Sequence, residues 1–406
     1  MVSNFVYRWT ALLLGAVALS GCFSAASEGE PPQPPPQAQP VSLQQQESLA
    51  TMLDQSWVAY QEWFIQGDGR VIDREDADRS TSEGQAYAML RAVLIDDPET
   101  FEQTFQWAEN NLQRADGSQG QLWSWRWGQD DGGTWRILDA NFATDADIDA
   151  IAALILAARR WNRPDYQAAA QEKLVDLWTY ATLAAPGTGN QPRYLLPGPR
   201  SAFEKDNKIY LNPSYFAPYA FRLFAQVDPQ RDWLSLVDSS YAVLNQLSDI
   251  AVLPPDWITL TLTTGELGLS GNDSLRSVYS FDAYRVWWRI RLDDWWFDEP
   301  RARDYLSAQL PVLTQLWQSQ GKIPARIDSE GKPTVEYEST AQYAMLYLGF
   351  QGVDSGAVER ILQEKLVPAY ENGFWDNRSA YYVQNLGWFA IYDFQSFNRL
   401  WLNSRS

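Results

Sequence analysis

The segment that decides the fold is residues 143–161, with the sequence ATDADIDAIAALILAARRW. Its apolar side chains recur at positions i, i+3, i+4 and i+7, the spacing of one face of an α-helix. These residues are Ile148, Ile151, Ala152 and Ile155. The same spacing returns near the C-terminus, at Ala341, Ala344, Met345 and Leu348. The periodicity therefore predicts a protein made mainly of helices.

Outward from these segments, strand-like alternation is scarce, and the best short candidates are residues 252–253 and 258–262. Residues 82–90 (SEGQAYAML) resemble residues 339–346 (STAQYAML), which indicates repeated helical hairpins. Around a dozen helices, at about 30 residues for each helix and its loop, would use the chain up. This predicts a closed ring of helical hairpins rather than a four-helix bundle.

The N-terminal residues indicate export. Arg8 precedes an apolar stretch at residues 9–19, which is shorter than the ~20 residues that span a bilayer and fits a signal peptide. The sequence Leu19-Ser20-Gly21-Cys22 resembles a bacterial lipobox, in which Cys22 would carry the lipid. A plain secretory signal with an unused cysteine is the alternative. We expect a signal peptide at residues 1–21 and a lipid anchor in the cell envelope, facing the periplasm or on the outer membrane.

Residues 22–42 are rich in proline and glutamine and include Pro34-Pro35-Pro36, a composition typical of an extended tether. We therefore expect one domain over residues 43–406, acting as a monomer.

The composition excludes several kinds of chemistry. The 406 residues include no histidine and one cysteine, so Ser-His-Asp triads, imidazole metal sites and disulfide frameworks are excluded. The net charge of −19 argues against nucleic acid as a partner. Carboxylates, hydroxyls and amides remain, beside 20 Trp, 20 Tyr and 17 Phe residues.

Three acidic motifs are candidates for chemistry, and each has a plainer explanation. In Thr81-Ser82-Glu83-Gly84-Gln85, Ser82 and Gln85 match a capping box, so Glu83 also suits a first helical turn. Asp145 and Asp147 stand where a helix begins, and capping accounts for them equally well. Calcium would need a loop with more oxygen ligands than this segment offers.

The third motif, residues 279–289, places Asp282 three residues before Arg285 and among five aromatic residues. An ordinary ion pair within a helix is one interpretation, and a carboxylate at the edge of an aromatic cleft is the other. Trp123, Trp125 and Trp127 alternate, so an extended segment would place all three on one face, where a sugar chain could stack. Core packing is an equally good explanation for these tryptophans.

Together the motifs resemble glycoside hydrolase family 8, and within it the endoglucanases of bacterial cellulose synthesis. The matching motifs are Gly69-Arg70-Val71-Ile72-Asp73, residues 81–85, Trp125-Arg126-Trp127-Gly128, residues 143–161, Asn212-Pro213-Ser214-Tyr215-Phe216, and Phe281-Asp282-Ala283 with Arg285. The resemblance implies an all-α fold, an (α/α)6 barrel of helical hairpins with a few short strands in loops. It also implies endo-acting hydrolysis of β-1,4-glucan with inversion, which uses two carboxylates and no metal or cofactor.

The resemblance also assigns roles by position. Glu83 would be the general acid and Asp282 the general base, while Asp145 would hold and distort the sugar. Arg285 would orient Asp282. Trp125, Trp127, Tyr215 and Phe281 would contact the polysaccharide. The family commonly has tyrosine where this chain has Phe281, so one hydroxyl contact to the water is expected to be missing.

The electrostatic expectation for Glu83 combines two opposed effects. The helix dipole lowers its pKa, whereas the nearby charge of Asp145 raises it. We expect a pKa above the ~4.3 of a free Glu.

Three alternatives remain open from the sequence. The first is a β-1,4-xylanase of the same family. The second is a non-catalytic glucan-binding envelope lipoprotein on the same fold, consistent with Phe281. The third is a helical scaffold that binds protein. A link to machinery for cellulose or exopolysaccharide synthesis is a further expectation from the resemblance.

Overall fold

The structure is a computed structural model, and it describes residues 43–114, 117–118, 120–185 and 193–403. The predicted signal peptide, the tether and the lipid-bearing Cys22 lie outside these residues and stay predictions. In the described part of the chain, no helix has the length and apolar character needed to cross a membrane.

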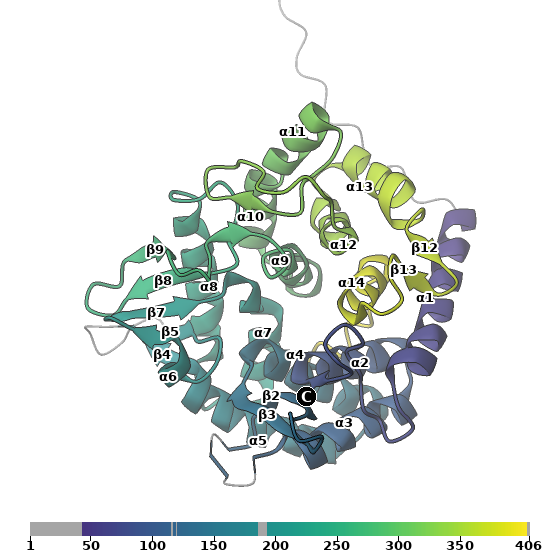
Figure 1. Cartoon of the computed structure of the whole chain (residues 1–406), viewed down its shortest axis with the longest axis vertical. Helices are drawn as coiled ribbons and strands as arrows, with labels where there is room; N and C mark the ends of the chain where they lie inside the picture. Colours follow the sequence, from purple (N-terminus) through teal and green to yellow (C-terminus); the bar gives the residue numbers. More distant parts are fainter. Residues whose placement is uncertain (1–42, 115–116, 119, 186–192, 404–406) are drawn as a thin grey trace, which may run out of the picture. The chain divides into compact units, whose positions relative to one another are not determined.

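Six inner helices form the centre of the domain, and each contacts the next in chain order (Figure 1). The last also contacts the first, which closes the ring. These helices are α2 (Ser82–Ile95), α4 (Thr144–Trp161), α7 (Pro218–Val227), α9 (Arg285–Phe297), α12 (Thr340–Phe350) and α14 (Tyr381–Ile391). The two segments that resemble each other in sequence, at residues 82–90 and 339–346, belong to the inner helices α2 and α12.

The outer helices surround this ring. Most pack on an inner helix next to them in the chain, α1 packs on the C-terminal α14, and α11 contacts α10. They are α1 (Leu43–Phe64), α3 (Pro98–Leu112), α5 (Pro164–Ala181), α8 (Trp233–Leu247), α10 (Pro300–Gln309) with α11 (Pro311–Gln320), and α13 (Ser355–Ile361), which continues into a π-helical turn at Leu362–Leu366. The expected (α/α)6 fold is thus confirmed.

The inner helices differ from the sequence interpretation in one respect. The spacing in residues 143–161 indicates one apolar face, but every residue of α4 from Thr144 to Arg159 is buried. Similarly, α12 is buried from Ala341 to Phe350. A helix enclosed by neighbours on all sides has no exposed face, so its few polar side chains need partners inside the protein.

Short antiparallel sheets connect the helices. A three-stranded sheet joins β1 (Ser80–Thr81), β2 (Ser124–Gln129) and β3 (Trp135–Phe142). A four-stranded sheet joins β6 (Glu204–Lys205), β7 (Lys208–Leu211), β8 (Ile258–Thr261) and β9 (Leu267–Leu269). The two-stranded pairs are β4 (Thr182–Ala184) with β5 (Arg193–Leu195), β10 (Val278–Tyr279) with β11 (Ile327–Asp328), and β12 (Tyr370–Glu371) with β13 (Phe374–Trp375).

Of the two predicted strand segments, one is confirmed and one is wrong. Strand β8 occupies most of residues 258–262. Residues 252–253 form a bend instead. Pro254 and Pro255 follow directly, and because proline has no N–H to donate to a strand ladder, the segment cannot continue as a paired strand.

Candidate functional site

Glu83 is placed by the start of α2. The sequence predicts Ser82 as the helix cap with Gln85 as its capping-box partner, and both assignments are wrong. Thr81 is the N-cap residue, and its hydroxyl accepts a hydrogen bond from the Gly84 N–H at 3.0 Å. The Gln85 amide is buried and instead donates to the Gly69 and Thr104 carbonyls, so its own N–H groups are hydrogen-bonded inside the protein.

The second acidic motif separates into two roles. Neither aspartate caps α4, whose N-cap is Ala143 without a side-chain hydrogen bond. Asp147 accepts a hydrogen bond from the Trp123 N–H at 3.1 Å and thereby holds the segment that enters β2. Asp145, which is almost completely buried, forms an ion pair with Arg285 at 2.7 Å. Only one of the two carboxylates therefore joins the site.

Asp282 lies in the turn that leads into α9, before the helix begins at Arg285. Its Oδ1 accepts from the Arg285 guanidinium at 2.9 Å, and its Oδ2 accepts from the Asn212 amide at 3.1 Å. About a third of its side chain stays exposed. The carboxylate is thus oriented by two donors and still reaches solvent.

The guanidinium of Arg285 joins three carboxylates. One nitrogen contacts both Glu83 and Asp145 at 2.7 Å, and the other contacts Asp282 at 2.9 Å. Since Glu83 and Asp282 both bond to this single group, the bonded oxygens lie within roughly 8 Å of each other. Residues separated by about 200 positions in the chain therefore meet where the N-terminal ends of α2, α4 and α9 converge.

The surroundings of Glu83 raise its pKa to about 7. Burial is the largest cause, and the charge of Asp145 adds to it, while Arg285 and a hydrogen bond from Tyr381 act in the opposite direction. Burial also raises the pKa of Asp282, opposed first by Arg285. Burial is therefore the main reason for the raised pKa of Glu83, which lies in the direction expected from the sequence.

One helical turn deeper, the same two helices make a second ion pair. Arg289 of α9 donates to both oxygens of Asp149 of α4, at 2.7 and 2.8 Å. Both side chains are fully buried, and the Tyr219 hydroxyl donates to Asp149 at 3.3 Å. This pair matches one cation with one carboxylate.

The predicted aromatic contacts are distributed unequally. Tyr215 lies beside the carboxylates, with its ring centroid 5.4 Å from the Arg285 guanidinium carbon. Phe281 is exposed next to Asp282, and its backbone carbonyl accepts a hydrogen bond from the Tyr382 hydroxyl at 2.6 Å. Both residues are thus at the candidate site.

The three alternating tryptophans do not form one shared face. Trp123 is fully buried before β2 begins, and Trp127 stacks on Trp135 with ring centroids 4.9 Å apart. The pairing of β2 with β3 is irregular on both sides of Arg126, and such a bulge breaks the two-residue alternation. Trp125 and Trp127 are half-buried on β2. This strand pairs with β1, and β1 is followed directly by the start of α2 and Glu83.

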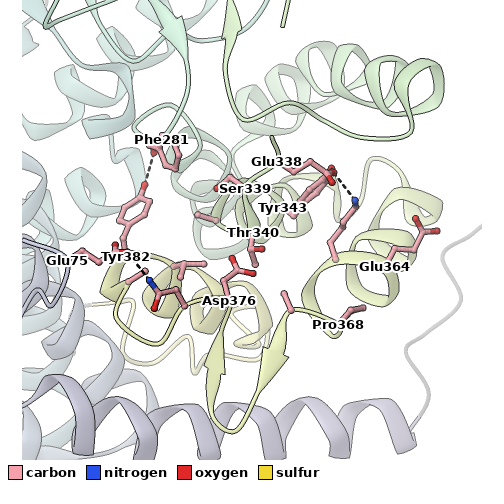
Figure 2. A pocket seen from close by; sticks show the side chains of 16 residues that line it. Glu75, Phe281, Glu338, Ser339, Thr340, Tyr343, Glu364, Pro368, Asp376 and Tyr382 are labelled. Atoms are coloured by element: carbon pink, nitrogen blue, oxygen red, sulfur yellow. Dashed lines mark hydrogen bonds and ion pairs between the residues drawn. The ribbon is translucent and has the colours of Figure 1, made fainter. Parts of the chain in front are cut away.

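A pocket of about 750 Å³ lies beside Phe281, the residue that precedes Asp282 in the chain (Figure 2). Phe281 and Tyr382 form its boundary toward the carboxylates, and the hydrogen bond between them is visible in Figure 2. Hydroxyl and amide side chains line it further out, among them Ser339, Thr340 and Asn377. Four acidic side chains and Lys365 also line it, so aromatic rings stand beside neutral and charged hydrogen-bonding groups, a lining that can hold a carbohydrate.

Comparison with known proteins identifies the family. The model of glycosyl hydrolases family 8 matches residues 39–356. The chain belongs to glycosyl hydrolase family 8. Among its relatives, an endoglucanase of Xanthomonas axonopodis pv. citri (strain 306) is 36% identical over 241 residues, which cover 58% of this chain and 60% of that protein. The match thus spans less than two thirds of that relative.

Two further relatives cover more of the chain. An endoglucanase of Escherichia coli (strain K12) is 30% identical over 313 residues, covering 75% of this chain and 79% of that protein. The crystal structure of an endo-1,4-D-glucanase from Vibrio fischeri ES114 matches with a TM-score of 0.71 at 26% identity. That match covers 85% of this chain and 97% of the other.

Several polar residues at this family 8 site have no assigned role in the sequence interpretation. The Tyr381 hydroxyl donates to Glu83 at 2.7 Å, the Asn212 amide donates to Asp282, and Arg285 donates to the Ser214 hydroxyl at 3.2 Å. Asn212 and Ser214 belong to the motif that also contains Tyr215, so the motif itself was a usable signal. Tyr381 begins α14 and offers no comparable signal in the sequence.

Proposed function

We propose that this family 8 chain is an endo-acting glycoside hydrolase that cleaves β-1,4-linked glucan, with Glu83 as general acid and Asp282 as general base. The observation that carries the proposal is the meeting of three carboxylates around Arg285 at one end of the helical ring. Relatives named endoglucanases support a cellulose-type substrate.

The proposed acid is Glu83, because a pKa of about 7 keeps its carboxyl group protonated in mildly acidic solution. Its proton would pass to the glycosidic oxygen as the bond to the anomeric carbon breaks. Tyr381 and Arg285 each contact one oxygen of this carboxyl group, which fixes its orientation toward the substrate.

The proposed base is Asp282, which would take a proton from water as the water oxygen attacks the anomeric carbon. Arg285 and Asn212 stabilise its ionised form, and its exposed side gives water access. Inverting enzymes separate the two carboxyl groups by ~6.5–9.5 Å to leave room for the water. The bound of roughly 8 Å set by Arg285 is compatible with that range.

Asp145 would accept hydrogen bonds from the sugar at the cleavage point, and Tyr215 would pack against its ring. The pocket beside Phe281 and Tyr382 would hold sugar residues further along the chain. A polymer bound across this open pocket would be cut at internal bonds.

The stereochemistry of the product tests the mechanism. Cellopentaose is cleaved by the wild-type chain while one-dimensional proton NMR follows the anomeric signals. The account predicts that the α-anomer appears first and that Asp282→Asn abolishes its formation. Initial β-anomer would contradict inversion, and tight binding without cleavage would favour the glucan-binding alternative. Faster release of reducing sugar from xylan than from β-glucan would favour the xylanase.

We further propose that Cys22 carries a lipid and that the enzyme trims a polymer its own cell exports. The lipobox-like sequence at residues 19–22 and the resemblance to the cellulose-synthesis endoglucanases support this proposal. Membrane fractionation of cells producing wild type and Cys22→Ser tests the anchor. Equal recovery of both in the membrane fraction would contradict it.

A further inference from the structure

Asp256 is a buried carboxylate directly behind the proposed base. It lies in the bend between Pro255 and strand β8, and only 7% of its surface is exposed. Its own backbone N–H donates to the Val278 carbonyl at 2.7 Å, which ties the bend to strand β10. Burial of a carboxyl group is costly unless its oxygens are hydrogen-bonded, so its contacts indicate what it is for.

All three hydrogen bonds of this carboxyl group go to the turn that carries Asp282. One oxygen accepts from the Ser280 N–H at 3.1 Å and from the Ala283 N–H at 2.8 Å. The other contacts the Ser280 hydroxyl. Asp256 therefore holds the turn on both sides of Asp282 without contacting that side chain through a hydrogen bond of its own.

The three donors are neutral, so no cation offsets the burial of Asp256 in these contacts. Burial, followed by the negative charge of Asp282, raises the pKa of Asp256 to about 7. In mildly acidic solution the group is thus mostly protonated, and asparagine is a close mimic of it. The other titratable or charged side chains that face these two carboxylates are Glu83, Asp145, Tyr215, Tyr279, Tyr284, Arg285 and Tyr382.

Trp257, the residue after Asp256, packs against a second part of the site, the ring of Tyr215. The Trp257 ring stacks on Phe203 with centroids 5.7 Å apart and packs against Tyr215 at 6.4 Å. The Asp256–Trp257 pair thus contacts both the turn of the proposed base and the ring proposed to meet the sugar.

We propose that Asp256 is a positioning residue, which holds the turn at residues 280–283 so that the Asp282 carboxylate stands where it can activate water. The proposal rests on the proposed function, since it assigns Asp256 an effect that acts through Asp282. A misplacement of about 1 Å in a reacting group can cost roughly 10²-fold in rate.

The test compares variants that keep or remove the three hydrogen bonds, with kcat and KM measured on cellopentaose at mildly acidic pH. Asp256→Ala is expected to lower kcat by about 10²-fold at nearly unchanged KM. Asp256→Asn, which can still accept both N–H bonds, should retain most of kcat. Ser280→Ala, which loses only the hydroxyl contact, should lower kcat several-fold. A kcat equal to that of the wild type in Asp256→Ala would overturn the proposal. If Asp256→Ala does not fold, a wild-type kcat in Ser280→Ala would overturn it instead.

A buried carboxylate far from the turn gives the matched control. Asp228 is 8% exposed and accepts a hydrogen bond from the Trp233 indole at 2.8 Å, so Asp228→Ala should lower the melting temperature without lowering kcat. In an Asp282→Asn background, Asp256→Ala should have almost no further effect on the residual rate. Full additivity would overturn the positioning role. Wild-type activity of Asp282→Asn alone would instead refute the proposed function.

Discussion

Two of the three arginines of helix α9, Arg285 and Arg289, lie one turn apart, and each meets an aspartate of α4, but their surroundings differ. Arg289 faces Asp149 alone in the closed interior. Arg285 faces Asp145 together with Glu83 and Asp282, at the end of the ring that reaches solvent. The deeper pair balances one positive charge with one negative charge, whereas the outer cluster places three carboxylates on one cation.

The difference explains which pair stabilises the fold and which can do chemistry. In the one-to-one buried pair, both oxygens of Asp149 accept hydrogen bonds from Arg289 and no second carboxylate shares the guanidinium, so the pair ties α9 to α4. In the outer cluster the burial of Glu83, with the charge of Asp145 added, outweighs the opposing effect of Arg285 and raises the pKa of Glu83 to about 7. Burial beside further carboxylates thus supplies an acid next to a base.

The largest expected effect is on catalysis in the outer cluster. Glu83→Gln removes the proposed proton donor, so kcat on soluble β-glucan should fall by about 10³-fold to 10⁴-fold. Because the pKa of Glu83 is raised from 4.5 to about 7 on folding, wild type loses stability as the pH rises above 4.5, so the neutral variant should have the higher free energy of unfolding at mildly acidic pH. Reducing-sugar assays and urea denaturation measure the two quantities. Full turnover by this variant would refute the assignment of the acid.

The deeper pair should show the reverse behaviour. Asp149→Ala leaves the Arg289 guanidinium buried without its carboxylate, which should lower the free energy of unfolding by about 3–5 kcal/mol. Urea denaturation followed by circular dichroism measures the loss.

A double variant is the control for this pair. Asp149→Leu with Arg289→Met removes both charges and should recover much of the stability, because no unpaired group is left. If the single variant lost less stability than the double variant, the pair would not have the structural role assigned to it.

The smallest expected effect concerns the pH dependence. The charge of Asp145 raises the pKa of Glu83, so Asp145→Asn should lower that pKa. The acid then loses its proton at lower pH, and the alkaline limb of the kcat/KM profile should move to lower pH. The pH profiles of kcat/KM for the wild type and Asp145→Asn, measured on cellopentaose, show this shift. A limb that stays in place or moves to higher pH would exclude the electrostatic role of Asp145.

Much of the fold follows from local patterns in the sequence. The helical spacing and the resemblance between residues 82–90 and 339–346 predict repeated hairpins, and both segments are inner helices. The complete burial of α4 could not be predicted, because the same apolar spacing suits a half-exposed helix and an enclosed one. Likewise, the alternation of Trp123, Trp125 and Trp127 does not reveal the irregular pairing that separates their faces.

The candidate site shows the limit of local reasoning more clearly. The i, i+3 spacing of Asp282 and Arg285 predicts their ion pair, which the structure contains. The contacts of Arg285 with Glu83 and Asp145 depend on closure of the ring, and no local pattern encodes them. Asp256 belongs to none of the sequence motifs. Its partners are backbone N–H groups and a serine hydroxyl, and no local pattern around Asp256 indicates them.

The central claim is that burial, reinforced by the negative charges of Asp145 and Asp282, keeps Glu83 protonated close to neutral pH. A carbon-13 NMR titration of the side-chain carboxyl groups, with the Glu83 signal assigned by its loss in Glu83→Gln, measures this directly. The account predicts a midpoint at a pH of about 7 for Glu83. A midpoint close to the ~4.3 of a free glutamic acid would contradict it.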